Sequence, residues 1–247
     1  MNPALRTIDV TWPAPAHVRA AFTTRCGGVS RGPWHGLNLA DHVGDAPAHV
    51  RANRDLLAAA ISLPRAPDWL EQVHGNDVLE LDSGATGRQA DAAITRVGGR
   101  VAAVLVADCL PLLLCDRRGH EVAAVHAGWR GLDAGVIART VRRFSRPAHE
   151  LLAWIGPGIG VAAYAVGADL RARFITADAG NASAFVAIDG VWHCDLAALA
   201  QRQLTASGVG SITLAAGCVH ADAELFYSYR RDGVTGRMAA LVWRASA

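Results

Sequence analysis

The centre of the chain carries short, nearly continuous runs of apolar residues bounded by Gly, Pro and polar residues. Runs of this length and setting predict buried β-strands. We expect strands at 18–23, 90–95, 101–107, 110–115, 121–127, 151–155 and 211–215, and a hairpin-like pair at 69–73 and 77–81. The predicted strands therefore gather in the middle of the sequence.

Other segments have the apolar spacing of helices. These are 47–60, 133–144, 167–175 and 196–206, whereas 84–89 and 176–183 are expected to be surface loops. Asp45 can cap the first helix, and Pro47 suits its first turn. Asp195 can cap the last helix, which Gly208 should end.

Strands in the centre, with helices between and after them, indicate an α/β or α+β layered fold. We expect one or more central mixed β-sheets flanked by helices. No linker rich in Pro, Gly or Ser divides the sequence, and no repeat of solenoid period occurs. The whole chain, 1–247, is therefore interpreted as a single domain, long enough to bury a core without a disulfide or a metal.

Composition excludes several classes of function. The formal net charge is +2, so charge gives no reason to expect nucleic-acid or membrane binding. All 24 basic residues are Arg, which excludes a Walker-A loop, a Lys Schiff base and a Ser-Lys dyad. The five irregularly spaced cysteines and the lack of a leader-like start or a membrane-length apolar run favour a cytoplasmic protein with reduced thiols.

Polar residues occupy the ends of three predicted strands. The segment QVHG contains His74, VAAVLVADC ends in Asp108-Cys109, and EVAAVHAGWRG contains His126. Strand ends are where layered α/β folds collect ligands. Two His and one Cys suit a three-ligand zinc site with an open fourth position, although their spacing matches no local zinc signature.

The same residues support two other interpretations. Cys109 can be a nucleophile activated by His126 or His74, with Asp108 orienting the His. Alternatively, Cys109 is a small apolar core residue, and both His side chains bind backbone groups. The sequence does not separate a thiolate ligand from a thiolate nucleophile, since both need a nearby cation or metal.

Arginines in glycine-rich segments are candidates for anion contacts. Arg25 lies in TTRCGGVS, and Arg230 and Arg231 lie in YSYRRDGVTGR. A guanidinium in such a loop can bind phosphate or carboxylate with two hydrogen bonds. It can equally be a solvated charge, or form a salt bridge with Asp232 or Asp45.

Eight motifs in order resemble one known family. They are TTRCGGVS, GLNLADHVGD, NRDLL, QVHG, ADCLPLLLCD, AAVHAGWRGL, IGPGIG and YSYRRDGVTGR, and they extend from residue 23 to 237. The set resembles bacterial proteins first called multicopper polyphenol oxidases or laccases. These proteins are now described as purine nucleoside phosphorylases with adenosine deaminase activity, and members are also called peptidoglycan editing factors.

The resemblance implies roles for the residues at matching positions. The metal ligands would be His74, Cys109 and His126, with zinc favoured over copper. The implied substrate-binding residues are Asn38, Gln72, Arg230 and Arg231. Arg25, at a position that also matches the family pocket, is a catalytic candidate together with Cys109 and Asp108, which are proposed from their own chemistry. Two positions depart from the family pattern, Ala165 after Tyr164 and Val219 after Cys218, which leaves the preferred substrate in doubt.

The resemblance also implies a reaction. Inorganic phosphate would attack the sugar of adenosine, inosine or methylthioadenosine and release the base and ribose 1-phosphate. Zinc with Arg25 or Arg230 would hold the phosphate, and Asp108 would move protons or orient a ligand His. Water activated at the zinc would deaminate adenosine. The expected partners are nucleosides and phosphate, and the chain would be a monomer or a dimer.

Three rival functions stay open at this point. A laccase needs many His ligands in H-x-H pairs, but this chain has ten His and no such pair. A cysteine hydrolase would use Cys109 with His126 on peptidoglycan precursors. A binding partner of cell-wall ligases would need no chemistry at all, so it would not depend on His74.

Overall fold

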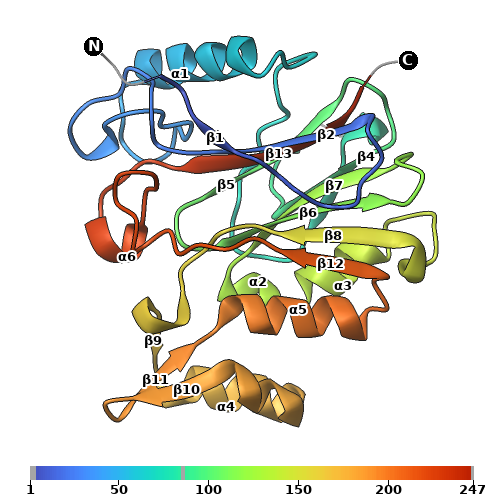
Figure 1. Ribbon diagram of the computed structural model, residues 1–247, viewed down its shortest axis with the longest axis vertical. Helices are drawn as coiled ribbons and strands as arrows, with labels where there is room; N and C mark the ends of the chain where they lie inside the picture. Colours follow the sequence, from blue (N-terminus) through green and yellow to red (C-terminus); the bar gives the residue numbers. More distant parts are fainter. Residues whose placement is uncertain (1–3, 85–86, 246–247) are drawn as a thin grey trace.

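The computed structural model describes residues 4–84 and 87–245, and these residues form stacked layers (Figure 1). Helix α1 (Pro47–Ala60) covers one sheet, this sheet packs on a second one, and further helices cover the far side of the second sheet. The predicted fold class, a layered α/β fold with mixed sheets, is confirmed. The prediction of one domain rests on the sequence alone.

The first sheet is antiparallel and, in the described residues, has four strands. Their order is β1 (Thr7–Ile8), β2 (Val18–Thr23), β13 (Met238–Arg244) and β5 (Val101–Val106). Strand β13 was not predicted, although its apolar run resembles that of β5. Because β13 pairs with both β2 and β5, it brings the C-terminal segment into the centre of this sheet.

The second sheet is mixed and has six strands among the described residues. In order they are β12 (Ser211–Leu214), β8 (Leu151–Ile155), β6 (Leu110–Asp116), β7 (Val122–Ala127), β4 (Ala92–Thr95) and β3 (Val78–Glu80). The predicted hairpin at 69–73 and 77–81 is wrong. Residues 69–73 form no strand apart from an isolated bridge at Glu71, because β3 pairs in parallel with β4 instead.

The continuous apolar runs are explained by burial on both faces. In β5, Val101, Ala103 and Leu105 face the core under α1, whereas Ala102, Val104 and Val106 face the second sheet. Strand β6 likewise divides its residues between the inter-sheet core and the core under the helices. A strand covered on both faces has no polar side, so it shows no alternation.

Helices α2 (Trp129–Asp133), α3 (Val136–Val141) and α5 (Leu196–Ala206) cover the outer face of the second sheet. The predicted helix at 133–144 is shorter in the structure and corresponds to α3, because Gly135, with a left-handed φ of 81°, separates α3 from α2. Asp195 caps α5 as predicted. The predicted Asp45 cap of α1 is wrong, since Ala46 is the N-cap and gives no side-chain cap.

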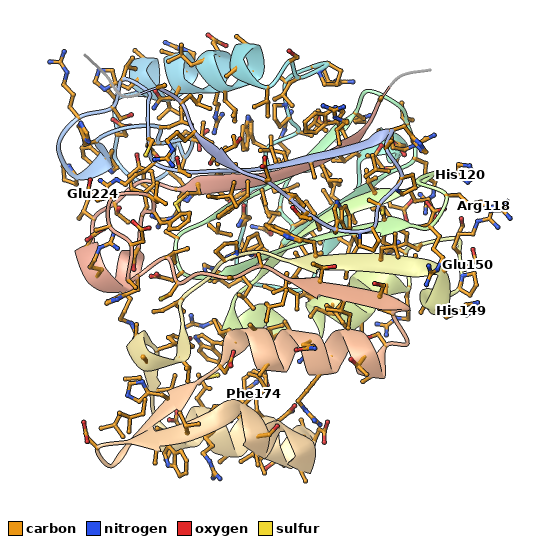
Figure 2. The ribbon with its side chains drawn as sticks, viewed as in Figure 1. Arg118, His120, His149, Glu150, Phe174 and Glu224 are labelled. Atoms are coloured by element: carbon orange, nitrogen blue, oxygen red, sulfur yellow. The ribbon has the colours of Figure 1, made fainter. Side chains whose placement is uncertain are left out.

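A small three-stranded sheet lies beyond α5 (Figure 1). It contains β9 (Ala165–Val166), β10 (Phe185–Ile188) and β11 (Val191–Cys194), with α4 (Ala168–Ala177) beside it. Phe174 of α4 joins the core under the second sheet, and Figure 2 shows it between this unit and α5. The expected loop at 176–183 is wrong, because a 3-10 helix covers Ala179–Ala184; the expected loop at 84–89 lies partly outside the described residues.

The two ends of the stacked sheets differ. Arg118 and His120 mark the β6–β7 turn at one end (Figure 2), and α6 (Tyr229–Asp232) lies at the other (Figure 1). Shorter 3-10 turns occur at Gly32–Trp34, Leu81–Ser83, Ala148–Glu150 and Val161–Ala163. Within the described ranges, no helix is long and apolar enough to cross a membrane.

Candidate metal centre and adjoining cavity

The segment between β5 and β6 is the corner at which the chain passes from one sheet to the other. Asp108 lies in this corner with φ of 93°, a conformation that is uncommon outside glycine. Its two carboxylate oxygens accept hydrogen bonds from Ser228 Oγ and from the Arg230 backbone N, each at 2.6 Å. These contacts hold the corner, and Cys109 follows directly.

The structure brings the three predicted ligands together. The ligand atoms of His74, Cys109 and His126 all lie within 4.8 Å of one another. The two imidazole rings meet edge to face, with centroids 4.8 Å apart. His126 lies in β7, Cys109 directly precedes the neighbouring strand β6, and His74 comes from the loop before β3.

A buried carboxylate that the sequence analysis missed organises this cluster. Asp91 Oδ1 lies 2.8 Å from His126 Nδ1, which leaves Nε2 of that ring free to face a metal. The same carboxylate accepts the backbone N–H groups of Val73, His74 and Gly75 at 2.6–3.2 Å. Asp91, which is fully buried, thus holds one ligand by its ring and another by its backbone.

The charges in the cluster favour a thiolate. Burial alone raises the pKa of Cys109, but His126 and His74 outweigh burial and lower this pKa to about 6. Burial likewise lowers the pKa of His126, but Cys109 and Asp91 outweigh it and raise that pKa to about 9. A thiolate is the form of cysteine that binds a metal, and metal binding would displace the His126 proton.

Gly128 lets the backbone pass close to the cluster. A Cβ at this position would lie 2.7 Å from Cys109 Sγ and 3.3 Å from His74 Cδ2. Any side chain here would push against two ligands at once. The glycine of the HAGWRG motif is therefore required by packing rather than by backbone conformation.

This donor set fits a transition-metal ion. Two imidazoles and one thiolate form a three-ligand set with a free position, as in catalytic zinc sites. The carboxylate behind His126 is the orienting contact that ligand histidines usually have. Within residues 4–84 and 87–245, this is the single group of three or more His, Cys, Asp or Glu side chains placed to hold an ion.

A cavity of about 540 Å³ adjoins the cluster. Its volume is in the range of small-molecule sites. The lining comes from the cluster, from the β5–β6 corner, from α2 and from the C-terminal segment: His42, Gln72, His74, Leu105, Val106, Ala107, Asp108, Cys109, His126, Trp129, Arg130, Ile159, Tyr164, Tyr229, Arg230 and Arg237.

Two of the predicted substrate-binding residues line this cavity, Gln72 and Arg230. The amide of Gln72 bonds to both the N–H and the C=O of Leu105, which fixes it at the end of β5. Arg230 Nη1 donates to the carbonyl of Ala165 at 3.0 Å. Both residues can therefore contact a ligand while remaining anchored to the protein.

Three other predicted residues, Asn38, Arg25 and Arg231, bind groups of the protein itself. Asn38 is fully buried, and its side chain binds Asp45, Ala40 and the backbone N of Arg237. Arg25 donates to two backbone carbonyls and lies over the ring of Tyr227. Arg231 donates to three backbone carbonyls and to Asp232. These contacts give all three residues a structural role, and none of them lines the cavity.

Three cavity arginines each lie over an aromatic ring. Arg130 lies over Trp129, Arg230 over Tyr164 and Arg237 over Tyr229, at 4.5, 5.0 and 5.8 Å from the ring centroids. Arg130, Arg237 and Tyr229 were not predicted, although each lies inside a motif of the resemblance. These residues could be found in the motifs, but the sequence does not show which polar side chains of a motif line a cavity.

A family model described as multi-copper polyphenol oxidoreductase laccase matches residues 19–245. The chain belongs to this family. It is 48% identical over 233 residues to the purine nucleoside phosphorylase YfiH of Shigella flexneri, covering 94% of this chain and 96% of that protein. It is 47% identical over 234 residues to a purine nucleoside phosphorylase of Pseudomonas aeruginosa, with the same coverage.

Solved structures of this family have the same fold. Neisseria meningitidis protein NMB0706 superposes with a TM-score of 0.91 at 43% identity, covering 98% of this chain and 99% of that one. YlmD from Geobacillus stearothermophilus superposes with a TM-score of 0.86 at 29% identity, covering 99% and 100%. The resemblance inferred from the eight motifs is confirmed.

Proposed function

We propose that this protein is a zinc-dependent purine nucleoside phosphorylase. The observation that carries the proposal is the His74–Cys109–His126 cluster at the edge of an arginine-rich cavity of about 540 Å³. The names of the relatives from Shigella flexneri and Pseudomonas aeruginosa support the same activity. The substrates would be a purine nucleoside and inorganic phosphate.

The cavity offers groups for both substrates. Tyr229 is 60% exposed beside the cavity and can stack on a purine, and Gln72 can bind polar atoms of the nucleoside. The cavity arginines can neutralise phosphate as its oxygen attacks C1′ and the bond from C1′ to the purine nitrogen breaks. The electrons of that bond go to the leaving base, which then takes a proton.

His74, Cys109 and His126 would hold the zinc, and Asp91 would keep His126 in the required tautomer. When bound, zinc would supply Lewis-acid charge next to the reacting groups. Asp108 was expected to move protons or to orient a ligand His. Its two oxygens bind Ser228 and Arg230 instead, so we propose that it shapes the cavity wall.

The rival functions fit the geometry less well. A multicopper oxidase needs several metal sites, whereas the described part of the chain has one cluster of suitable ligands. A cysteine hydrolase would need Cys109 and one imidazole, whereas two imidazoles lie beside Cys109 and complete a three-ligand metal set. Deamination of adenosine, implied by the resemblance, would use the same zinc, and formation of inosine without phosphate tests it.

The proposal is tested by metal analysis and product analysis of the purified protein. We expect one zinc per chain, and release of hypoxanthine and ribose 1-phosphate from inosine that depends on added phosphate. The same assay with adenosine and methylthioadenosine ranks the substrates. A zinc-loaded protein that gives no phosphate-dependent product from any purine nucleoside would overturn the proposal.

A further inference from the structure

A second cavity, of about 690 Å³, adjoins the first. The two cavities share three lining residues, Trp129, Tyr164 and Arg230. The rest of the second cavity comes from β9, Gly167 and one side of α4, in the small unit beyond α5 (Figure 1). The three shared residues therefore mark a junction between the metal cavity and this outer cavity.

Tyr164 has a polar group at the junction without a partner in the protein. Its side chain is 8% exposed, and within the described residues its hydroxyl makes no hydrogen bond. Burial and Cys109 raise the pKa of this hydroxyl, while Arg230 and Arg130 lower it. The hydroxyl thus lies within electrostatic reach of both the metal cluster and two guanidinium groups. Because Tyr164 lines both cavities, this hydroxyl can donate a hydrogen bond to a polar ligand there.

The two guanidinium groups keep their charge available. Arg130 lies 4.5 Å from the Trp129 centroid and Arg230 lies 5.0 Å from the Tyr164 centroid. Among the described residues, neither forms an ion pair with a carboxylate, in contrast to Arg173 of the same outer cavity, which binds Asp133. An aromatic face positions a cation without neutralising it.

Among the described residues, the acidic side chains of the two cavities form no ion pair with the guanidinium groups of Arg130 and Arg230. Asp108 is the acidic residue of the first cavity, and both of its oxygens already accept hydrogen bonds. Asp169, the acidic residue of the second cavity, is exposed in the first turn of α4. A ligand at the junction would meet two guanidinium groups and one hydroxyl donor, which is a donor set for a phosphoryl dianion.

We propose that Tyr164, Arg130 and Arg230 form the subsite that binds the attacking inorganic phosphate. This inference rests on the proposed phosphorolysis and places its second substrate at the junction of the two cavities. Arg237, the other cavity arginine, is less suited because it lies over Tyr229, which lines only the first cavity, and not over a residue of the junction. The nucleoside would then lie between the phosphate and the wall that carries Tyr229.

The test uses the zinc-loaded full-length protein and two measurements, titration calorimetry with inorganic phosphate and the KM values for phosphate and inosine. In Arg130→Gln and Arg230→Gln, we expect the Kd and the KM for phosphate to rise about 10- to 100-fold, because a charged hydrogen-bond donor is lost. Tyr164→Phe should raise both about 3- to 10-fold. The KM for inosine should change less than about threefold, since this loss affects one substrate.

Matched variants control for the loss of an arginine or a hydroxyl elsewhere. Arg171 lies 4.1 Å from the Trp192 centroid but lines neither cavity, so Arg171→Gln should leave phosphate binding unchanged. The buried hydroxyl of Tyr227 donates to backbone carbonyls, so Tyr227→Phe should also leave it unchanged. Thermal melting of each variant verifies that it is folded, and Arg230→Lys provides a charged replacement with less geometric fit.

Phosphate binding that is unaffected in both arginine variants would overturn the subsite. It would also be overturned if inosine 5′-monophosphate, but not inorganic phosphate, bound in an arginine-dependent way, since the junction would then hold a phosphate ester of the substrate. Arginine-dependent phosphate binding without any phosphorolysis would support the subsite and contradict the proposed function. Phosphorolysis with a KM for phosphate that is unchanged in both arginine variants would support the proposed function and contradict the subsite.

Discussion

The two sides of the metal cavity are built differently, and an aspartate lies behind each. On the metal side, Asp91 is fully buried and binds the ring of His126 together with three successive backbone N–H groups. On the substrate side, Asp108 binds Ser228 and the backbone of Arg230. Asp91 therefore positions two metal ligands, whereas Asp108 positions the residues on the opposite side of the cavity.

The contacts behind each side of the cavity indicate where a substitution would leave the metal bound. The metal side uses the ends of two central strands and has no space for a side chain at Gly128. The substrate side uses α6 and short neighbouring segments, and Tyr229 is largely exposed there. We therefore expect substitutions on the substrate side to alter substrate binding, and substitutions on the metal side to remove the metal.

The largest expected effect is the loss of the metal in Cys109→Ala. Removing the thiolate leaves two imidazoles, which cannot complete the three-ligand set. Elemental analysis should find zinc well below one per chain, and phosphorolysis should be abolished. Cys115→Ala is the matched control, because Cys115 is a buried core thiol of β6, the strand that follows Cys109, and the variant should keep its zinc. Full zinc in Cys109→Ala would contradict the ligand assignment.

The second largest effect is expected in the pH dependence of Cys109 reactivity. In protein stripped of metal, alkylation of Cys109 by iodoacetamide should have a midpoint near pH 6 rather than near 9, because His126 and His74 lower its pKa. Since the folded-state pKa is the lower one, the thiolate stabilises the fold at high pH, and this contribution is lost as pH falls through about 6. Mass spectrometry locates the modified residue.

Cys115 is the internal comparison for this reactivity. Burial raises the pKa of Cys115 to about 12, so it should stay unmodified at neutral pH. Zinc should protect Cys109, and His126→Gln should move the midpoint upward. A midpoint near 9 in the stripped wild-type protein would show that the histidines do not stabilise the thiolate.

A smaller effect is expected for Asp91→Asn. The amide keeps the shape of the carboxylate but loses the charge that orients His126, and such changes typically weaken metal binding about 10- to 100-fold. Competition with a chelator measures this affinity. Asp116→Asn is the matched control, because Asp116 is equally buried and accepts backbone N–H groups at the far end of β6. Equal zinc affinities in the two variants would contradict the role of Asp91 in positioning the metal ligands.

The smallest effect on the metal is expected for Asp108→Asn. This variant loses a charged acceptor for Ser228 and Arg230, so the free energy of unfolding should fall by about 1–3 kcal/mol. Zinc affinity should change less than about threefold. The KM for inosine should rise, because Ser228 and Arg230 are held less firmly. Chemical denaturation, chelator competition and kinetics measure the three quantities. Strong zinc loss in this variant would erase the contrast between the two aspartates.

The sequence by itself determined the layered class and the three metal-ligand candidates. Apolar runs located most strands of the two large sheets, and a polar residue at the end of such a run is visible without any structure. His74, Cys109 and His126 could therefore be selected from local pattern. The motifs also identified the family, because their order along the chain needs no tertiary information.

Only the tertiary structure decided which residues support and surround those ligands. Asp91 reaches His126 because the register of β4 and β7 pairs Ala92 with Val125, next to both residues. Arg237 reaches the cavity because Met238 pairs with Val106, beside the corner that holds Cys109. Conversely, Asn38 and Arg231 have the right chemistry, but their donors bind groups of the protein itself. Periodicity along the chain is a local property, whereas strand register and side-chain direction depend on partners far away in the sequence.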